Sequence, residues 1–127
     1  MLNKDKGWIE DIIENIKDIE IFTRNVSHEE FLKSLEKQKA IYFSISVIGE
    51  TVKRLSDEFM IRNKDIKWAE IAKMRDKLIH HYNDIDEEIV WKVIKSDIPV
   101  LKKALKNELK KIKKIEKQNI NNRDAGR

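Results

Sequence analysis

Apolar side chains recur every three or four residues along most of this sequence, and almost nothing interrupts the pattern. Near the start, five isoleucines fall on one helical stripe: Ile9, Ile12, Ile13, Ile16 and Ile19. The 127 residues include only three glycines and one proline, the residues that break helices most strongly. With 40% hydrophobic and 39% charged residues, the chain can form both a core and a solvated surface. We therefore predict an all-α protein, a bundle of about five amphipathic helices.

Capping and turn residues separate the expected helices. Ser27, followed three residues later by Glu30, forms a capping box that predicts the start of a short second helix. Asp86, followed by two glutamates, is a suitable N-cap for the last helix, which Pro99 must then kink or restart. The expected helices cover about residues 4–23, a short stretch from 27, 35–59, 68 to near 80, and 86 onward.

The expected helix over residues 35–59 has two apolar faces, which indicates that more than one neighbour buries it. In a small bundle the second face suggests a subunit interface. Gly49 lies in the middle of this helix at a cost of roughly 1 kcal/mol relative to alanine, so we expect a close helix approach there. Glu50 beside it could point into a dimer cleft or form an ordinary salt bridge.

The absence of cysteine excludes disulfide bonds and fits a reducing cytoplasm. The N-terminal sequence MLNKDKGWIEDII contains acidic side chains and no uninterrupted apolar run. We therefore expect neither a secretory signal nor a membrane span.

The formal net charge of +4 is unevenly distributed. Residues 1–100 carry 17 basic and 20 acidic side chains, whereas residues 101–127 carry 10 basic and 3 acidic ones. Such a basic segment can contact RNA or an acidic partner, although a solvated helix end has the same composition. After Gln118 the sequence NINNRDAGR is typical of a frayed terminus. We expect a single domain over residues 1–118 and a disordered basic tail over residues 119–127.

The side chains best suited to chemistry lie in residues 74–86, MRDKLIHHYNDID. Arg75 falls on an apolar helical stripe, where an arginine needs a partner, an anion or an interface. His80 follows five residues later, and on an unbroken helix it points about 140° away from Arg75. The two share one site only if the helix ends near His80, or if two copies of the motif meet. The turn-forming dipeptide at 83–84 permits the first and a symmetric dimer supplies the second; we favour a dimeric cleft.

Asp76 lies four residues before His80, so its carboxylate can reach the imidazole and fix its tautomer. An arginine, a histidine and an orienting carboxylate suit metal-independent RNA cleavage, although the spacing alone only permits it. The adjacent His80 and His81 cannot both face one metal from a regular helix, and we expect no metal and no cofactor. His28, in the first turn of the short helix, is expected to be an exposed surface residue.

The spacing Arg75-x-x-x-x-His80-x-Tyr82 resembles the signature of HEPN-domain toxins, specifically the HepT family that is paired with minimal nucleotidyltransferase (MNT) antitoxins. Further segments resemble the family in order and at compatible spacing: Ile48-Gly49-Glu50 with Lys53-Arg54-Leu55-Ser56, Trp68-Ala69-Glu70-Ile71, Ile85-Asp86 with Ile89-Val90-Trp91, and Asp97-Ile98-Pro99. Together they span about residues 2–105. Two positions depart from the family: the dipeptide at 83–84 replaces Phe-Gly, and Lys67 replaces a proline.

The resemblance implies a HEPN-type bundle, homodimeric with the motif at the dimer cleft, that acts as an endoribonuclease toxin. It assigns the chemistry to Arg75 and His80. By spacing alone Tyr82 is expected to be a core or interface residue. The resemblance instead implies that the MNT partner transfers AMP from ATP to this tyrosine, which excludes RNA from the site. The expected partners are a second copy of the chain, an MNT-type nucleotidyltransferase antitoxin and RNA.

A second class of function stays open. The same basic cleft suits a non-catalytic helical module that binds a nucleotidyltransferase partner or a nucleotide. One test distinguishes the enzyme from the binding module. Only an enzyme loses an activity when His80 is replaced and the protein remains folded and dimeric.

Overall fold

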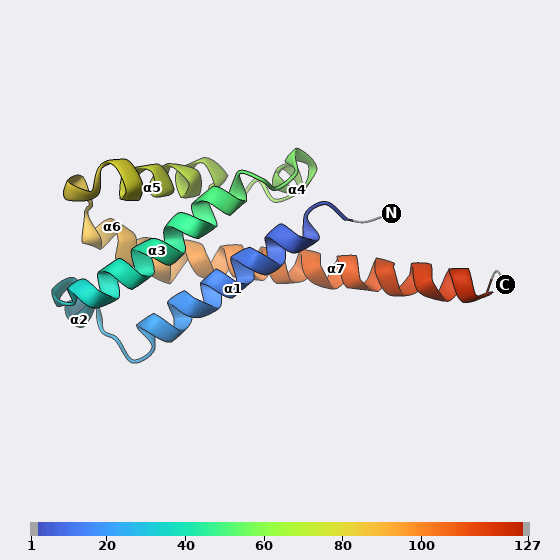
Figure 1. Ribbon diagram of the computed structural model, residues 1–127, viewed down its shortest axis with the longest axis horizontal. Coiled ribbons are helices and arrows are strands. Elements are labelled where there is room, and N and C mark those ends of the chain that lie inside the picture. Colours follow the sequence, from blue (N-terminus) through green and yellow to red (C-terminus); the bar gives the residue numbers. More distant parts are fainter. Residues whose placement is uncertain (1–2, 126–127) are drawn as a thin grey trace.

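The computed structural model describes residues 3–125, with side chains as far as residue 123. Within this range every regular element is a helix, which confirms the predicted all-α class (Figure 1). The helices are α1 (Lys6–Thr23), α2 (His28–Lys33), α3 (Leu35–Val52), α4 (Asp57–Arg62), α5 (Trp68–His80), α6 (Glu87–Lys92) and α7 (Ile98–Ala125). A 3₁₀ turn (Tyr82–Asp84) follows α5, and a π-helical turn (Val93–Asp97) joins α6 to α7.

Helix α3 is the centre of the bundle. It packs against α1 on one side and α5 on the other, and α1 packs in turn against α7 (Figure 1). The core consists mainly of isoleucine and leucine side chains from α1, α3 and α7, with Phe31 and Phe59 fully buried. This arrangement leaves α5, which carries the motif, at one side of the bundle. None of the described helices combines the length and apolarity that a membrane-crossing segment needs.

The single helix expected over residues 35–59 is wrong, because α3 ends at Val52 and α4 begins at Asp57. Ser56 is the N-cap of α4, and its side chain accepts a hydrogen bond from the backbone N–H of Phe59. The carboxylate of Asp5, which is buried, accepts bonds of 2.8 Å from the Ser56 N–H and 2.7 Å from its hydroxyl. The start of α1 therefore holds this helix boundary in place.

A second division, besides that between α3 and α4, makes the number of helices larger than the expected five. The segment after the motif divides into α6 and α7 at the π-helical turn, immediately before Pro99. Proline has no N–H to donate to the carbonyl four residues back, so the ladder of hydrogen bonds rearranges there. The prediction that Pro99 kinks or restarts the last helix is confirmed.

The predicted caps at Ser27 and Asp86 are also confirmed. The Ser27 side chain accepts a bond from the N–H of Glu30, and that of Asp86 accepts one from the N–H of Glu88. His28 is exposed as expected, but it also pairs with Glu88 at 2.7 Å and stacks on Trp91 with ring centroids 5.4 Å apart. These contacts join α2 to α6 at one end of the bundle.

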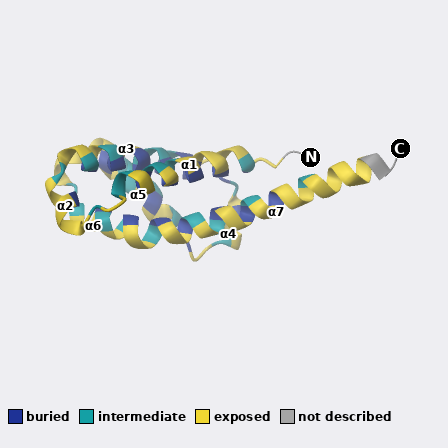
Figure 2. Cartoon of the chain, turned by 90° about the horizontal axis from the view of Figure 1, so that it is seen from below, coloured by how far each residue is buried: buried dark blue, intermediate teal, exposed yellow. Residues whose placement is uncertain are grey.

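Residues 119–125, which belong to the segment expected to be disordered, are the last turns of α7 in the structure. Residues 126–127 of that segment lie outside the described range. The end of α7 extends beyond the other helices, and almost all of its described residues are exposed to solvent (Figure 2). The domain boundary at residue 118 stays a prediction.

Gly49 lies at a close contact between α3 and α5. A Cβ atom at this position would collide with the Cβ of Arg75 and would lie 3.0 Å from the carbonyl oxygen of Ile71. The expected close helix approach is confirmed, and the neighbour is the helix that carries the motif. The missing side chain lets the stem of Arg75 pack directly on α3.

We expect Gly49→Ala to lower the free energy of unfolding by up to about 2 kcal/mol, because the overpacking cost of about 1–3 kcal/mol is offset by a gain of about 1 kcal/mol in helix propensity. Gly7→Ala is the matched control, since nothing lies within 4 Å of a Cβ built there. Urea unfolding of both variants measures the difference. A Gly49→Ala protein as stable as the Gly7→Ala protein would contradict this account of the helix contact.

Candidate functional site

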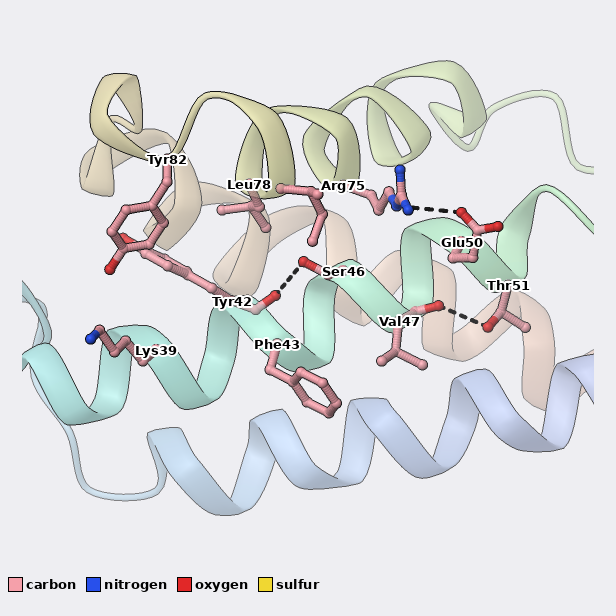
Figure 3. Close-up of a pocket in the computed structure, with 11 residues that line it drawn as sticks. Lys39, Tyr42, Phe43, Ser46, Val47, Glu50, Thr51, Arg75, Leu78 and Tyr82 are labelled. Atoms are coloured by element: carbon pink, nitrogen blue, oxygen red, sulfur yellow. Dashed lines mark hydrogen bonds and ion pairs between the residues drawn. The ribbon is translucent and has the colours of Figure 1, made fainter.

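A groove of about 490 Å³ runs between α3 and α5 (Figure 3). Arg75 and Glu50 lie towards one end of it, and Tyr82 and Lys39 lie towards the other. Its lining consists of Lys39, Tyr42, Phe43, Ser46, Val47, Glu50, Thr51, Arg75, Leu78, Ile79 and Tyr82. The groove therefore contains two of the motif residues, Arg75 and Tyr82, and the predicted cleft residue Glu50.

Arg75 is held by carboxylates from both helices. Its Nε lies 3.3 Å from Oε2 of Glu50, and its Nη1 lies 3.0 Å from Oδ1 of Asp76. Lys53 joins the cluster, with its Nζ 3.4 Å from the same Asp76 oxygen and 3.7 Å from Glu50. Within the described part of the chain, Nη2 of Arg75 donates no hydrogen bond. This nitrogen is thus available to donate to an anion in the groove.

Asp76 does not orient His80 as the spacing predicted. Its carboxylate turns towards Arg75 and Lys53, and His80 has no hydrogen-bond partner among the described residues. The hydrogen bond from Arg75, together with that from Lys53, lowers the pKa of the Asp76 carboxyl. Asp76 therefore pairs with Arg75. The predicted contact between Asp76 and the His80 imidazole is wrong within one copy of the chain.

His80 is the last residue of α5, so the helix does end at the histidine. The N–H of His81 still bonds to the carbonyl of Lys77 at 2.9 Å, and the chain then leaves the helix axis. His80 is exposed and does not line the groove that contains Arg75. The helix end alone therefore does not bring the two side chains into one site.

The two tyrosines of the chain meet in the groove. Tyr82 is 44% exposed, and its ring makes an edge contact with the ring of Tyr42, with centroids 6.2 Å apart. The Tyr42 hydroxyl is buried and has no hydrogen-bond partner within the described residues. Burial, with smaller contributions from the charges of Glu87 and Tyr82, raises the pKa of Tyr42 to about 12. Tyr42 is thus a neutral, enclosed phenol, whereas Tyr82 is open to solvent and to a partner.

Large apolar side chains are exposed along the same groove. Phe43 on α3 is 71% exposed, and Ile79 on α5 is 52% exposed. The second apolar face predicted for α3 is therefore partly uncovered in the single chain, with Phe43 its exposed member. A patch of this kind next to a charged cluster is typical of a surface that another protein covers.

The sequence did not identify several groove or cluster residues, among them Lys39, Tyr42 and Lys53. Lys53 lies three residues after Glu50, and that helical spacing could have indicated the ion pair between them. The others carried no signal, because a lysine or tyrosine at a helical position is common in any bundle. In the described part of the chain no group of three or more His, Cys, Asp or Glu side chains is placed to hold a metal ion.

These features define an all-helical domain with an arginine, a histidine and a tyrosine at the end of one helix beside a partly charged groove. The family described as "Ribonuclease HepT-like" matches residues 12–108. The chain belongs to this HepT-like ribonuclease family of HEPN domains, as the motif spacing suggested.

Individual relatives agree with the family match. "Probable ribonuclease HepT" of Thermococcus cleftensis is 40% identical over 114 residues, which are 90% of this chain and 100% of the relative. "Putative RNase MJ0127" of Methanocaldococcus jannaschii is 41% identical over 110 residues, 87% of this chain and 85% of the relative. "Putative RNase TTE0752" of Caldanaerobacter subterraneus is 37% identical over 108 residues, 85% of this chain and 96% of the relative. No solved structure matches the chain.

Proposed function

We propose that this protein is a metal-independent endoribonuclease that acts in the cytoplasm as the toxin of a HEPN/MNT toxin–antitoxin system. One observation carries the proposal: the chain belongs to a ribonuclease family, and Arg75, His80 and Tyr82 lie in the last turns of α5 and in the turn that follows it. Relatives named as ribonucleases support the reaction class. The toxin role and its control by a nucleotidyltransferase come from the motif's resemblance to HepT toxins.

The proposed reaction uses the substrate's own nucleophile. The ribose 2′-oxygen attacks the adjacent phosphorus, the bond to the 5′-oxygen breaks, and the products end in a 2′,3′-cyclic phosphate and a 5′-hydroxyl. One proton leaves the 2′-oxygen and one reaches the 5′-oxygen, and His80 exchanges one of the two as general base or acid. Arg75 donates hydrogen bonds to the phosphate and stabilises its developing charge. Asp76 and Glu50 position the guanidinium.

We propose further that the working site is shared by two copies of the chain. Arg75 lines the α3–α5 groove and His80 does not, so one copy does not offer both groups to one phosphate. The exposed Phe43 and Ile79 beside Arg75 give a second copy an apolar surface on which to dock. In a two-fold symmetric dimer, Arg75 of one copy and His80 of the other form each of two equivalent sites.

Mixed dimers test this arrangement. Arg75→Ala and His80→Ala chains are co-expressed with different tags, and the dimers that carry both tags are purified. Each variant alone is expected to be inactive, whereas the mixed dimer keeps one intact composite site and about half of the natural RNA cleavage rate.

The control adds Phe43→Asp to both chains, which places a charge on the proposed interface and should remove both the mixed dimers and the recovered activity. A purified mixed dimer without activity would contradict the composite site.

Tyr82 is the proposed point of control. Its phenol oxygen attacks the α-phosphorus of ATP bound to the nucleotidyltransferase, and pyrophosphate leaves. The exposure of Tyr82 supports access of a partner to this oxygen, and Lys39, which lines the same groove, can pair with the added phosphate. An AMP group in this groove occupies the space that RNA needs and brings negative charge towards the anion-binding arginine.

A further inference from the structure

Six lysines lie on one face of α7. On a helix with about 100° per residue they fall within an arc of about 100°, and from first to last they span about 21 Å. All six are exposed. They are Lys103, Lys106, Lys110, Lys113, Lys114 and Lys117, and we call them the lysine stripe.

The opposite face of α7 attaches the helix to the bundle. Leu101, Leu105 and Ile112 are buried there. Packing on this face turns the lysine stripe towards solvent, as the exposed surface of the outer half of α7 shows in Figure 2. Because these buried residues hold the first half of α7 against the bundle, the orientation of the stripe lysines there is set by the fold.

The acidic residues among the described side chains of α7 do not neutralise the stripe. Glu108 is buried and lies 2.7 Å from Arg62, while Glu116 lies 2.9 Å from Lys6 on α1. Lys102, which lies outside the stripe, forms an ion pair with Glu20 at 2.7 Å. Within the described part of the chain, none of the six stripe lysines has a carboxylate within 4.0 Å.

We infer that the lysine stripe binds the phosphate backbone of RNA, as an anchoring surface separate from the cleavage site. This inference rests on the proposed ribonuclease function. A row of unpaired ammonium groups without apolar or aromatic side chains between them matches a polyanion and carries no base specificity. Lysine is depleted in protein–protein interfaces, and the apolar face that a membrane surface needs is already buried in the bundle.

The match to the family model ends before most of the stripe. The family match ends at residue 108, and four of the six lysines follow it. We therefore infer the anchor from the lysines of this chain alone. Its predicted effect is on the binding of long RNA and not on the chemical step, because none of the stripe lysines lines the α3–α5 groove.

The test uses two variants with equal loss of charge. The stripe variant carries Lys106→Gln, Lys110→Gln, Lys113→Gln and Lys117→Gln. The control carries Lys4→Gln, Lys17→Gln, Lys33→Gln and Lys64→Gln, exposed lysines elsewhere on the chain. Both are made with His80→Ala, so that the binding of a 30-nucleotide single-stranded RNA is measured without cleavage. Circular dichroism verifies the helix content of each.

We expect the stripe variant to bind this RNA at least about tenfold more weakly at low salt, and the slope of log K against log salt to fall by about 3, at about 0.7 per lost phosphate contact. The control variant should keep the natural slope. With His80 intact, the stripe substitutions should raise KM for long RNA and leave the cleavage of a five-nucleotide RNA unchanged.

Unchanged RNA binding by the stripe variant would overturn the inference, and so would an equal loss in the control. A His80→Ala protein that binds anionic phosphatidylserine vesicles but not RNA would overturn it as well. These outcomes concern binding alone and are independent of whether the natural protein cleaves RNA.

Discussion

Replacing His80 with alanine is expected to reduce RNA cleavage by about 10²–10⁴-fold, the usual contribution of a positioned general acid or base. His80 is exposed and forms no hydrogen bond with the described residues, so its loss removes chemistry and little stability. The matched control is His81→Ala. This neighbouring histidine is also exposed but lies outside the helix, and its replacement should leave the rate within about twofold of natural by the same argument.

The same prediction of lost RNA cleavage applies to Arg75. Arg75→Ala should lower the rate by about 10²–10³-fold, because it removes the donors that stabilise the developing phosphate charge. Arg75→Lys keeps most of the stem that packs on Gly49 but loses the planar guanidinium. If phosphate binding needs that geometry, the lysine variant should be stable and nearly as inactive as the alanine variant.

The assay uses purified protein, total cellular RNA and a chelator of divalent metals, with unfolding and dimer mass measured in parallel. If His80→Ala cleaved RNA at the natural rate, His80 would have no role in the mechanism. If the chelator abolished cleavage by the natural protein, the proposal that the reaction needs no metal would be contradicted.

Tyr82→Phe is expected to abolish modification completely while RNA cleavage continues. Phenylalanine keeps the ring that contacts Tyr42 but has no oxygen to attack ATP. Co-expression with the nucleotidyltransferase should therefore neutralise the natural protein and fail to neutralise this variant. Mass spectrometry should find one added AMP per natural chain and none on Tyr82→Phe.

The other tyrosine of the chain provides the control. Tyr42 is 6% exposed, and burial holds its pKa at about 12, so its phenol is neither accessible nor easily ionised. A Tyr42→Phe protein should still receive AMP on Tyr82. Normal neutralisation of Tyr82→Phe by the partner would contradict the assignment of the modification site.

Local signals in the sequence predicted much of the fold. Gly49 indicated a close helix approach because glycine is costly inside a helical pattern, although its neighbours Ile71 and Arg75 lie on another helix. The capping residues Ser27 and Asp86 and the break at Pro99 each act through their own backbone or a near neighbour. Such effects are visible in a short window of residues. The break between α3 and α4 was missed because apolar periodicity continues across it, and Asp5, 51 positions before Ser56, helps to fix it.

The candidate site was predicted only in part. Helical spacing placed Asp76 within reach of His80, but Arg75 and Lys53 compete for the same carboxylate and carry full positive charge. Lys53 comes from the end of α3, so this competition depends on how α3 packs against α5. Spacing within one helix does not contain that information. For the same reason, the groove became visible only when both helices were placed, although the sequence had predicted the second apolar face of α3 to which Phe43 belongs.

The central claim is that this chain cleaves RNA through Arg75 and His80. The most direct measurement expresses the natural chain in cells without a nucleotidyltransferase and follows growth and RNA integrity in the same culture. We predict growth arrest with RNA fragments that end in 2′,3′-cyclic phosphates, and neither effect from the Arg75→Ala and His80→Ala chains at equal protein levels. Intact RNA and normal growth with folded natural protein, or equal arrest from the two variants, would contradict the claim.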